Sequence, residues 1–196
     1  LLPFYEPSMQ EALDEVRGVN LFFSTRADEA IRAADKIMVS VNTPIKDSGV
    51  GAGYAPDLGY WERIARLIAA ESNGPKVIVE RSTVPVRTAG AMSKVLSFNT
   101  AHKMVVISNP EFARQGNAMM DQASPERVMI GGDMREADGQ AAVESLAQEG
   151  IDLRVRSSGG ALQRGSVDGG FSARARRRKS TIALAAAHHG SLTPGS

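Results

Sequence analysis

The stretch that decides the fold is KIMVSVNTP, residues Lys36 to Pro44. An apolar run, typical of a buried strand, ends abruptly in the polar turn Asn42 to Pro44. Two further runs repeat this pattern, since KVIVE leads into RSTVP (Arg81 to Pro85) and KMVVIS leads into SNPEF (Ser108 to Phe112). Strands that are apolar on both faces are typical of parallel sheets covered on two sides. The repeats therefore predict a parallel sheet whose strands end in polar, proline-containing turns.

Helical patterns separate these strands along the first 147 residues. Between Asp57 and Ala70 the apolar residues recur at helical spacing, and Asp57 is a candidate N-cap. Alternating strands and helices predict a doubly wound α/β domain, or part of one, with right-handed crossovers. The predicted strands are 20–25, 36–41, 76–80, 103–108 and 127–132, and the predicted helices are 28–35, 57–70, 85–98 and 136–148.

Composition excludes several classes of function. The chain has 196 residues, a net charge of +1 and no cysteine, so it holds neither disulfides nor a cysteine nucleophile. Three histidines, with His188 and His189 adjacent, argue against a histidine site, and we predict no metal. No apolar run approaches the roughly 20 residues that cross a bilayer, and the start is not a signal peptide. We expect a cytoplasmic protein with no membrane partner; the initial leucine suggests a fragment.

The composition changes near residue 147 and divides the chain into two parts. Residues 148–196 are rich in Gly, Ser, Ala and Arg, with one short apolar stretch at Ile182 to Ala187. Such a segment buries too little apolar surface to offset its ordering entropy, so we predict a disordered, low-complexity tail. The basic run Arg174 to Lys179 could neutralise nucleic-acid phosphates or simply be solvated, and we favour the second interpretation.

The three polar turns define a candidate site. Ligands of open α/β sheets bind beyond the carboxyl ends of the strands, where all three turns would lie. Short Asn, Ser and Thr side chains can hydrogen-bond a ribose or phosphate without filling the cleft. Glu111 is the only carboxylate within these turns and is a candidate general acid or base. The same residue types are common in any βα turn, so a purely structural role is the alternative.

Two other features have simpler interpretations. GVGAG, Gly49 to Gly53, looks like a phosphate loop, but it lacks the GxGxxG spacing and does not directly follow a strand. We interpret it as a turn. Trp61 lies on the apolar stripe of a predicted helix, which favours a place in the core.

Six segments in register closely resemble the UDP-glucose 6-dehydrogenases of the UDP-glucose/GDP-mannose dehydrogenase family. They span about residues 2–134 and are LPFYEP, NLFFST, VSVNTP, GAGYAPDLGYWERIARLIA, VERSTVPVRTA and SNPEFARQGNAMMDQASPERVMIGG. The resemblance implies a Rossmann-like, NAD-binding sheet. For the full-length enzyme it implies NAD-dependent oxidation of UDP-glucose to UDP-glucuronate through a cysteine thioester, in a homo-oligomer. GDP-mannose dehydrogenase shares this plan and is the alternative enzyme, although LGYWERIARLIA and STVPVRT favour UDP-glucose.

The resemblance also implies roles for individual residues, carried over by position. The Thr83 position helps to hold a catalytic water, and the Glu111 position gives acid–base help in thioester hydrolysis. The implied cofactor-binding residues are Val41, Asn42, Thr43, Pro44, Ser82 and Gln115, and the implied substrate-binding residues are Glu111, Phe112, Ala113, Arg114 and Gln115. Two of these depart from the usual family pattern, because Gln115 replaces a glutamate and Arg114 replaces a small residue.

Other family signatures do not occur in this sequence. The GxGxxG turn of the first βαβ unit would precede Leu1, and the linking helix should begin after about residue 150. We therefore interpret residues 1–147 as a partial NAD-binding domain that lacks its first βαβ unit, within a truncated enzyme. Because there is no cysteine, we expect the isolated chain to be inactive. The alternative function is that of a non-enzymatic fragment, or of a partner to an intact subunit.

Overall fold

The computed structural model describes residues 4–123, 128–148, 154–155 and 181–184. Its main sheet has four parallel strands in the order β3-β2-β1-β6. The strands of this sheet are β1 (Lys36–Val39), β2 (Lys76–Glu80), β3 (Met104–Ser108) and β6 (Thr181–Leu184). A second, two-stranded sheet pairs β4 (Met129–Ile130) with β5 (Arg154–Val155), also in parallel.

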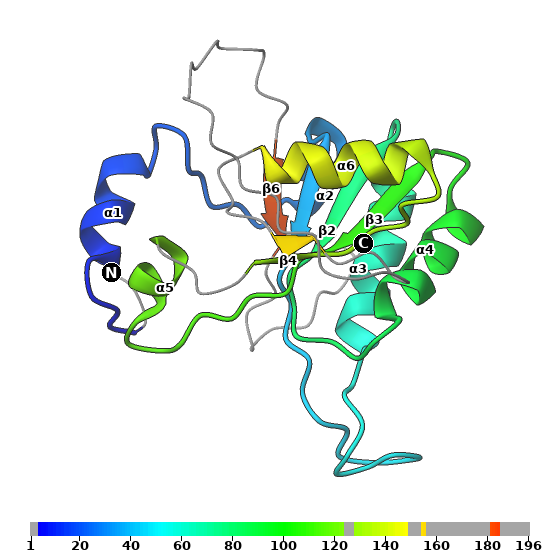
Figure 1. Cartoon of the computed structure of the whole chain (residues 1–196), viewed down its shortest axis with the longest axis horizontal. Coiled ribbons are helices and arrows are strands. Elements are labelled where there is room, and N and C mark those ends of the chain that lie inside the picture. Colours follow the sequence, from blue (N-terminus) through cyan, green and yellow to red (C-terminus); the bar gives the residue numbers. More distant parts are fainter. Residues whose placement is uncertain (1–3, 124–127, 149–153, 156–180, 185–196) are drawn as a thin grey trace.

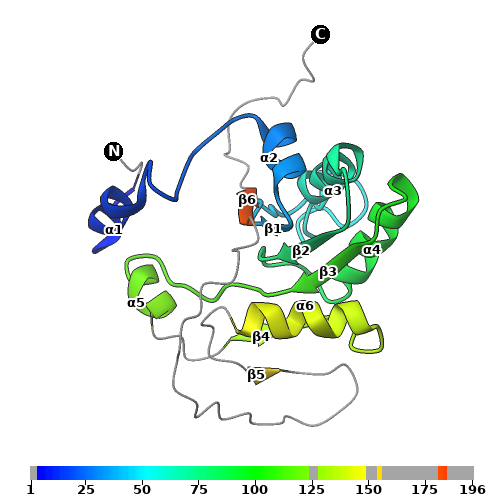
Figure 2. The ribbon, with the colours of Figure 1, turned by 90° about the horizontal axis from the view of Figure 1, so that it is seen from above.

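Helices cover both faces of the main sheet, which confirms the predicted doubly wound architecture (Figures 1 and 2). One face carries α2 (Ala27–Ala33), α3 (Gly59–Glu71) and α4 (Thr88–Asn99), and the other carries α6 (Ala137–Ala147). Two short helices, α1 (Met9–Val16) and α5 (Ala118–Ala123), lie together beyond the sheet, on the left in both views.

The strands are apolar on both faces because each face packs against its own core. On β2, Ile78 belongs to the larger core cluster beneath α3 and α4, whereas the next residue, Val79, belongs to the cluster beneath α6. On β3, Val106 likewise belongs to the larger cluster and Ile107 to the cluster beneath α6. Successive side chains of a strand point to opposite faces, so a strand covered on two sides needs a continuous apolar run. Trp61 is 1% exposed within the larger cluster, as predicted.

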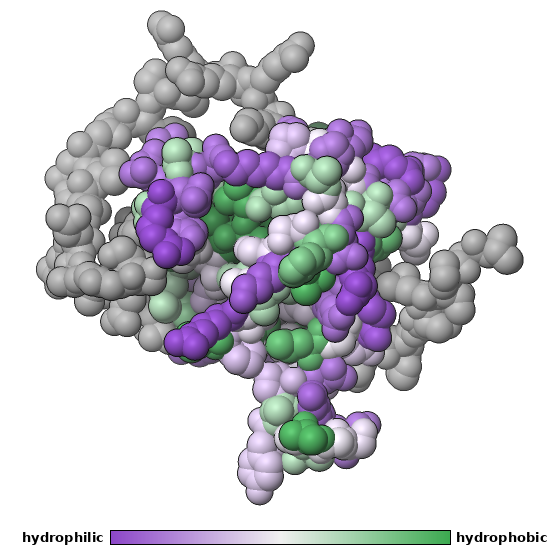
Figure 3. Space-filling model, turned by 90° about the vertical axis from the view of Figure 1, so that its right-hand side faces the viewer, coloured by the Kyte–Doolittle hydropathy of each residue, from purple (hydrophilic) through white to green (hydrophobic). Residues whose placement is uncertain are grey.

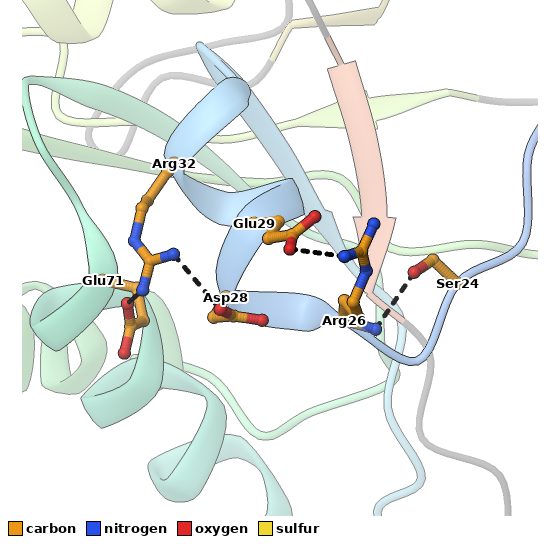
Figure 4. A network of polar contacts seen from close by, with 6 residues as sticks. All are labelled: Ser24, Arg26, Asp28, Glu29, Arg32 and Glu71. Carbon is orange, nitrogen blue, oxygen red and sulfur yellow. Dashed lines mark hydrogen bonds and ion pairs between the residues drawn. The ribbon is translucent and has the colours of Figure 1, made fainter.

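Polar contacts join α2 to its neighbours. Arg32 donates to Asp28 in its own helix and to Glu71 at the end of α3, as Figure 4 shows. The side chain of Arg32 is about half exposed, so these ion pairs contribute little to stability. The buried ammonium of Lys76 instead donates to the Ala34 carbonyl at 2.6 Å, beyond the end of α2, and burial lowers the pKa of this lysine.

Several predicted boundaries need correction. The strand predicted at 20–25 is wrong, since Leu21 makes a single bridge with Arg17 and both Phe22 and Phe23 are mostly exposed. Among the described residues this segment has no neighbouring strand, and a strand needs one to satisfy its backbone groups. β1 ends at Val39, two residues earlier than predicted. The strand predicted at 127–132 is reduced to the two residues of β4.

The helices differ less from the prediction. Asp57 was predicted as the N-cap, but α3 begins two residues later, with Leu58 at that position. The Asp57 carboxylate still accepts the first helical N–H, that of Gly59, at 2.8 Å. Helices α1 and α5 were not predicted. The pattern of Met9, Leu13 and Val16 was a signal for α1, although none of its residues is buried.

The predicted tail, 148–196, is described at only a few positions. Residues 154–155 form β5, and residues 181–184 form β6, at the start of the apolar stretch noted in the sequence. β6 pairs with β1 from Lys36–Thr181 to Val39–Leu184. The basic run Arg174 to Lys179, the histidine pair and most of the segment predicted to be disordered lie outside the described residues.

The surface carries scattered apolar groups. Figure 3 shows small hydrophobic patches among hydrophilic residues, one of them on the arm that projects from the sheet. This arm, residues 45–56, contains the predicted glycine turn, closed by backbone hydrogen bonds such as Lys46 N to Ala55 O at 2.8 Å. Its exposed apolar residues include Val50 and Tyr54. Within the described ranges, no helix combines the length and apolar character that crossing a membrane requires.

Candidate functional site

The first two polar turns are joined directly at the carboxyl edge of the sheet. The backbone N–H of Val41 donates to the Ser82 hydroxyl at 2.9 Å, and the Thr43 hydroxyl donates to the Thr83 carbonyl at 2.9 Å. Ser82 is 6% exposed, so the first of these bonds is shielded from water. The structure therefore brings together Val41, Thr43, Ser82 and Thr83, as the pattern of strand ends predicted.

Replacing Ser82 with alanine is expected to lower the free energy of unfolding by about 1–3 kcal/mol, because the buried N–H of Val41 then loses its acceptor. Urea unfolding followed by Trp61 fluorescence measures the change. Ser97→Ala is the matched control, since its hydroxyl is exposed and bonds within its own helix, and we expect less than about 0.5 kcal/mol. Equal losses in the two variants would contradict the assigned role of Ser82.

The third turn is tied to the second through Arg81. The Arg81 backbone N–H donates to the carbonyl of Val39 at 2.8 Å, at the end of β1. One guanidinium nitrogen, Nη1, donates to Asn109 Oδ1 at 2.7 Å, and the other, Nη2, lies 3.5 Å from Glu111 Oε2. Arg81 was not predicted as a site residue, although it is the first residue of RSTVP and Glu111 was the only carboxylate in the three turns.

Asn109 fixes the beginning of the third turn from inside the protein. It is 2% exposed, and its backbone N–H donates to the Glu80 carbonyl at 2.8 Å. Its side-chain amide donates to the carbonyl of Met129 at 2.8 Å, in β4. With Arg81 as donor to its oxygen, Asn109 links three strands and is structural rather than available to a ligand.

Glu111 lies between the second turn and α5. Its side chain is 40% exposed, with Oε2 near Arg81 and Oε1 accepting a hydrogen bond of 2.9 Å from Gln122 Nε2. The carboxylate is therefore oriented from two sides and still reaches solvent. Such a group can exchange a proton with a ligand or a water, and the acid–base role of Glu111 stays a prediction.

The other residues of this loop point in several directions. Arg114 binds the Asp121 carboxylate through its backbone N–H, Nε and Nη2, and this contact holds the pKa of Asp121 well below its ordinary value. Phe112 is 41% exposed and Ala113 is half-buried. Asn42 and Gln115 are exposed, and among the described residues no hydrogen bond joins either to the other turns.

A buried carboxylate lies directly beneath the turns. Glu80, the last residue of β2, is fully buried, and the Ser108 hydroxyl donates to its Oε2 at 3.1 Å. Burial raises the pKa of Glu80 to about 7, against the opposing effects of polar hydrogens from Ser108, Trp61 and Ser82. In the part of the chain that the structure describes, neither Glu80 Oε1 nor Trp61 Nε1 completes a hydrogen bond of good geometry.

The site thus combines hydroxyls, one exposed carboxylate and a guanidinium at one edge of a parallel sheet. These groups suit hydrogen bonding to a nucleotide or a sugar. Across the described ranges, no group of three or more Asp, Glu or His residues is placed to hold a metal ion.

A doubly wound sheet with its polar turns at the carboxyl edge is the architecture of nucleotide-binding α/β domains. The family model described as "UDP-glucose/GDP-mannose dehydrogenase family, NAD binding domain" matches residues 1–149. The chain belongs to this family.

Individual relatives agree with this assignment. UDP-glucose 6-dehydrogenase 3 of Oryza sativa subsp. japonica is 50% identical over 146 residues, which are 74% of this chain and 30% of the relative. A UDP-glucose dehydrogenase structure from Pyrobaculum islandicum matches with a TM-score of 0.61 and 30% identity, covering 79% of this chain and 35% of that one. The structure of a ternary complex of GDP-mannose dehydrogenase from Pseudomonas aeruginosa matches with a TM-score of 0.67 and 26% identity. The match covers 79% of this chain and 36% of that one. The chain therefore spans about a third of the length of the proteins it resembles.

Proposed function

We propose that this domain forms part of the NAD site of a UDP-glucose 6-dehydrogenase, which oxidises UDP-glucose to UDP-glucuronate. The observation that carries the proposal is the direct bonding of the first two turns, through Val41–Ser82 and Thr43–Thr83, at the carboxyl edge. The 50% identity to a UDP-glucose 6-dehydrogenase, against 26% to the GDP-mannose dehydrogenase structure, favours the glucose nucleotide over the alternative. A cytoplasmic location and a homo-oligomeric longer enzyme belong to the same proposal.

The residues of the joined turns suit an NAD site chemically. Asn42 brings an exposed amide, Thr43 a half-buried hydroxyl and Pro44 a half-buried apolar ring that a nicotinamide or ribose can contact. Val41 and Ser82 are buried and hold these turns in shape from beneath. Gln115 extends this set from the third turn. The cofactor, when bound, supplies the acceptor for the hydride that leaves the sugar alcohol.

Glu111 and Thr83 are the residues to which we assign catalytic roles. Thr83 is exposed and its hydroxyl can orient a water, while the Glu111 carboxylate, held by Arg81 and Gln122, can accept a proton from it. Phe112, Ala113, Arg114 and Gln115 continue the same loop and would contact the nucleotide sugar. The chain has no cysteine and so supplies no thiol for a thioester. By itself it is then catalytically inactive, or acts with an intact subunit.

Titration of the 196-residue chain with NAD tests the proposed site. We expect binding that Asn42→Ala weakens about tenfold, since an exposed amide of the joined turns is lost, a change of about 1.4 kcal/mol. Ser97→Ala, on the outer face of α4, is the control and should bind as the wild type does. Isothermal calorimetry measures both. Equal affinity of the two variants would refute the site, and NADH formation from UDP-glucose by the chain alone would refute its inactivity.

A further inference from the structure

Glu6 is buried where its surroundings predict exposure. The residue is 6% exposed, although the helix that follows it, α1, has no buried residue. Its carboxylate accepts hydrogen bonds from the backbone N–H groups of Gly116, at 2.8 Å, and Ala118. These partners come more than a hundred residues later in the chain, so Glu6 joins the N-terminal segment to the loop that follows β3.

The bonded amides lie where α5 begins. The first N–H groups of a helix have no acceptor within the helix, and a carboxylate that accepts two of them makes charge-assisted hydrogen bonds. Gly116 has a φ of +79°, a conformation that favours glycine and turns the chain into the helix. Glu6 therefore fixes both the turn and the start of α5.

Helix α5 in turn contacts the candidate acid–base residue. Gln122, in α5, donates through Nε2 to Glu111 Oε1 at 2.9 Å, while Arg81 approaches Oε2 from the sheet. The Arg81 side is anchored by the buried Asn109. The α5 side is anchored by the buried carboxylate of Glu6, so the orientation of Glu111 depends on a residue that does not touch it.

We propose that Glu6 is a positioning residue, which holds α5 in place and, through Gln122, sets the Glu111 carboxylate against Arg81. The importance of Glu111 rests on the proposed function, whereas the sequence of contacts from Glu6 to Glu111 does not. This role deepens that function by assigning to the LPFYEP segment a part in organising the loop 111–118.

The full 196-residue chain, labelled with ¹⁵N, allows each step to be measured by NMR. In Glu6→Ala, amide exchange of Gly116 and Ala118 is expected to rise at least about tenfold, because both lose their acceptor. The Gln122 side-chain amide signal should move toward its position in Glu111→Ala, since the partner is no longer held. Amides of β2 and β3 should keep their wild-type exchange.

Two further variants make the test specific. In Glu6→Gln one oxygen remains to accept one N–H while the NH₂ group cannot accept, so both readouts should lie between wild type and alanine. Glu15→Ala, an exposed carboxylate of α1, should leave both readouts unchanged. If alanine at position 6 unfolds the chain, the two readouts in Glu6→Gln test the positioning role instead.

The outcomes separate the inference from the proposed function. Faster exchange at Gly116 and Ala118 with an unmoved Gln122 signal would overturn the positioning role and leave Glu6 as a local cap. Unchanged exchange would overturn the contact itself. UDP-glucose and NAD are then added to the wild type. Failure of these ligands to protect the loop 111–118 counts against the proposed function, while the Gln122 signal still decides the role of Glu6.

Discussion

Glu80→Gln is expected to remove a pH-dependent loss of stability of about 3 kcal/mol, which the wild-type domain undergoes as the pH rises through about 7. The carboxyl of Glu80 is fully buried at the end of β2. The pKa of a glutamate is 4.5 by reference and about 7 for Glu80. A tenfold difference in proton affinity corresponds to about 1.4 kcal/mol, which gives the expected size.

The direction follows from which state binds the proton more tightly. Because the folded protein raises the pKa, the contribution of Glu80 to stability is fully present below about pH 4.5 and is lost as the pH rises through about 7. Glutamine has a similar shape and no titration. Its amide can still bond the Ser108 hydroxyl, which is able to donate or accept.

The measurement is the free energy of urea unfolding of wild type and variant at several pH values. The difference between them should grow by about 3 kcal/mol from acidic to mildly alkaline pH. Glu62→Gln is the control, since the Glu62 side chain is 54% exposed and its ion pair is with Arg66 of the same helix. Its difference should stay below about 0.5 kcal/mol. Parallel pH profiles for wild type and Glu80→Gln would refute the assignment.

Gly139→Ala is expected to destabilise the domain by about 3 kcal/mol, whereas Gly90→Ala should stabilise it by up to about 1 kcal/mol. Both glycines are the third residue of a helix, Gly90 in α4 and Gly139 in α6. A Cβ at position 139 would lie 2.2 Å from the Asp133 carbonyl oxygen, a backbone atom that cannot simply turn aside. At position 90 there is nothing within 4 Å, so only the better helix propensity of alanine remains.

Thermal and urea unfolding of the two variants provide the comparison, and each serves as the control for the other. The helical position and the chemical change are the same, so the difference in sign isolates the close approach of α6 to residue 133. Stabilisation by alanine at both positions would show that this backbone contact is looser than the structure has it.

Most of the sheet could be predicted because the apolar or polar character of each strand residue indicates what it packs against. The run of Ile78 and Val79 required apolar contacts on both faces of β2, and the structure provides two separate clusters. The joined turns at Val41 and Ser82 followed from the rule that parallel strands end at one edge. The predicted roles of the site residues in binding and chemistry stay predictions.

What could not be predicted depends on contacts between distant residues. The burial of Glu6 results from two amides more than a hundred residues away, and no local pattern marks a glutamate for that position. The aromatic segment at Phe22 and Phe23 has strand-forming residues, but it pairs with no strand in the part of the chain that the structure describes, so its propensity was misleading. Arg81 could have been paired with Glu111 by charge, but its bond to Asn109 depends on side-chain reach.

The pairing of β6 with β1 has a consequence for the order in which the protein is made. Val39 leaves the ribosome 145 residues before Leu184, its partner across the sheet, since 184 minus 39 is 145. At the usual rate of about 5–20 residues per second, this edge of the nascent sheet waits roughly 7–30 s for its neighbour. During that interval β1 presents unpaired backbone groups to any other extended chain. This edge of β1 is thus exposed to mispairing until β6 has been made, and that is the interval in which a ribosome-bound chaperone can shield it.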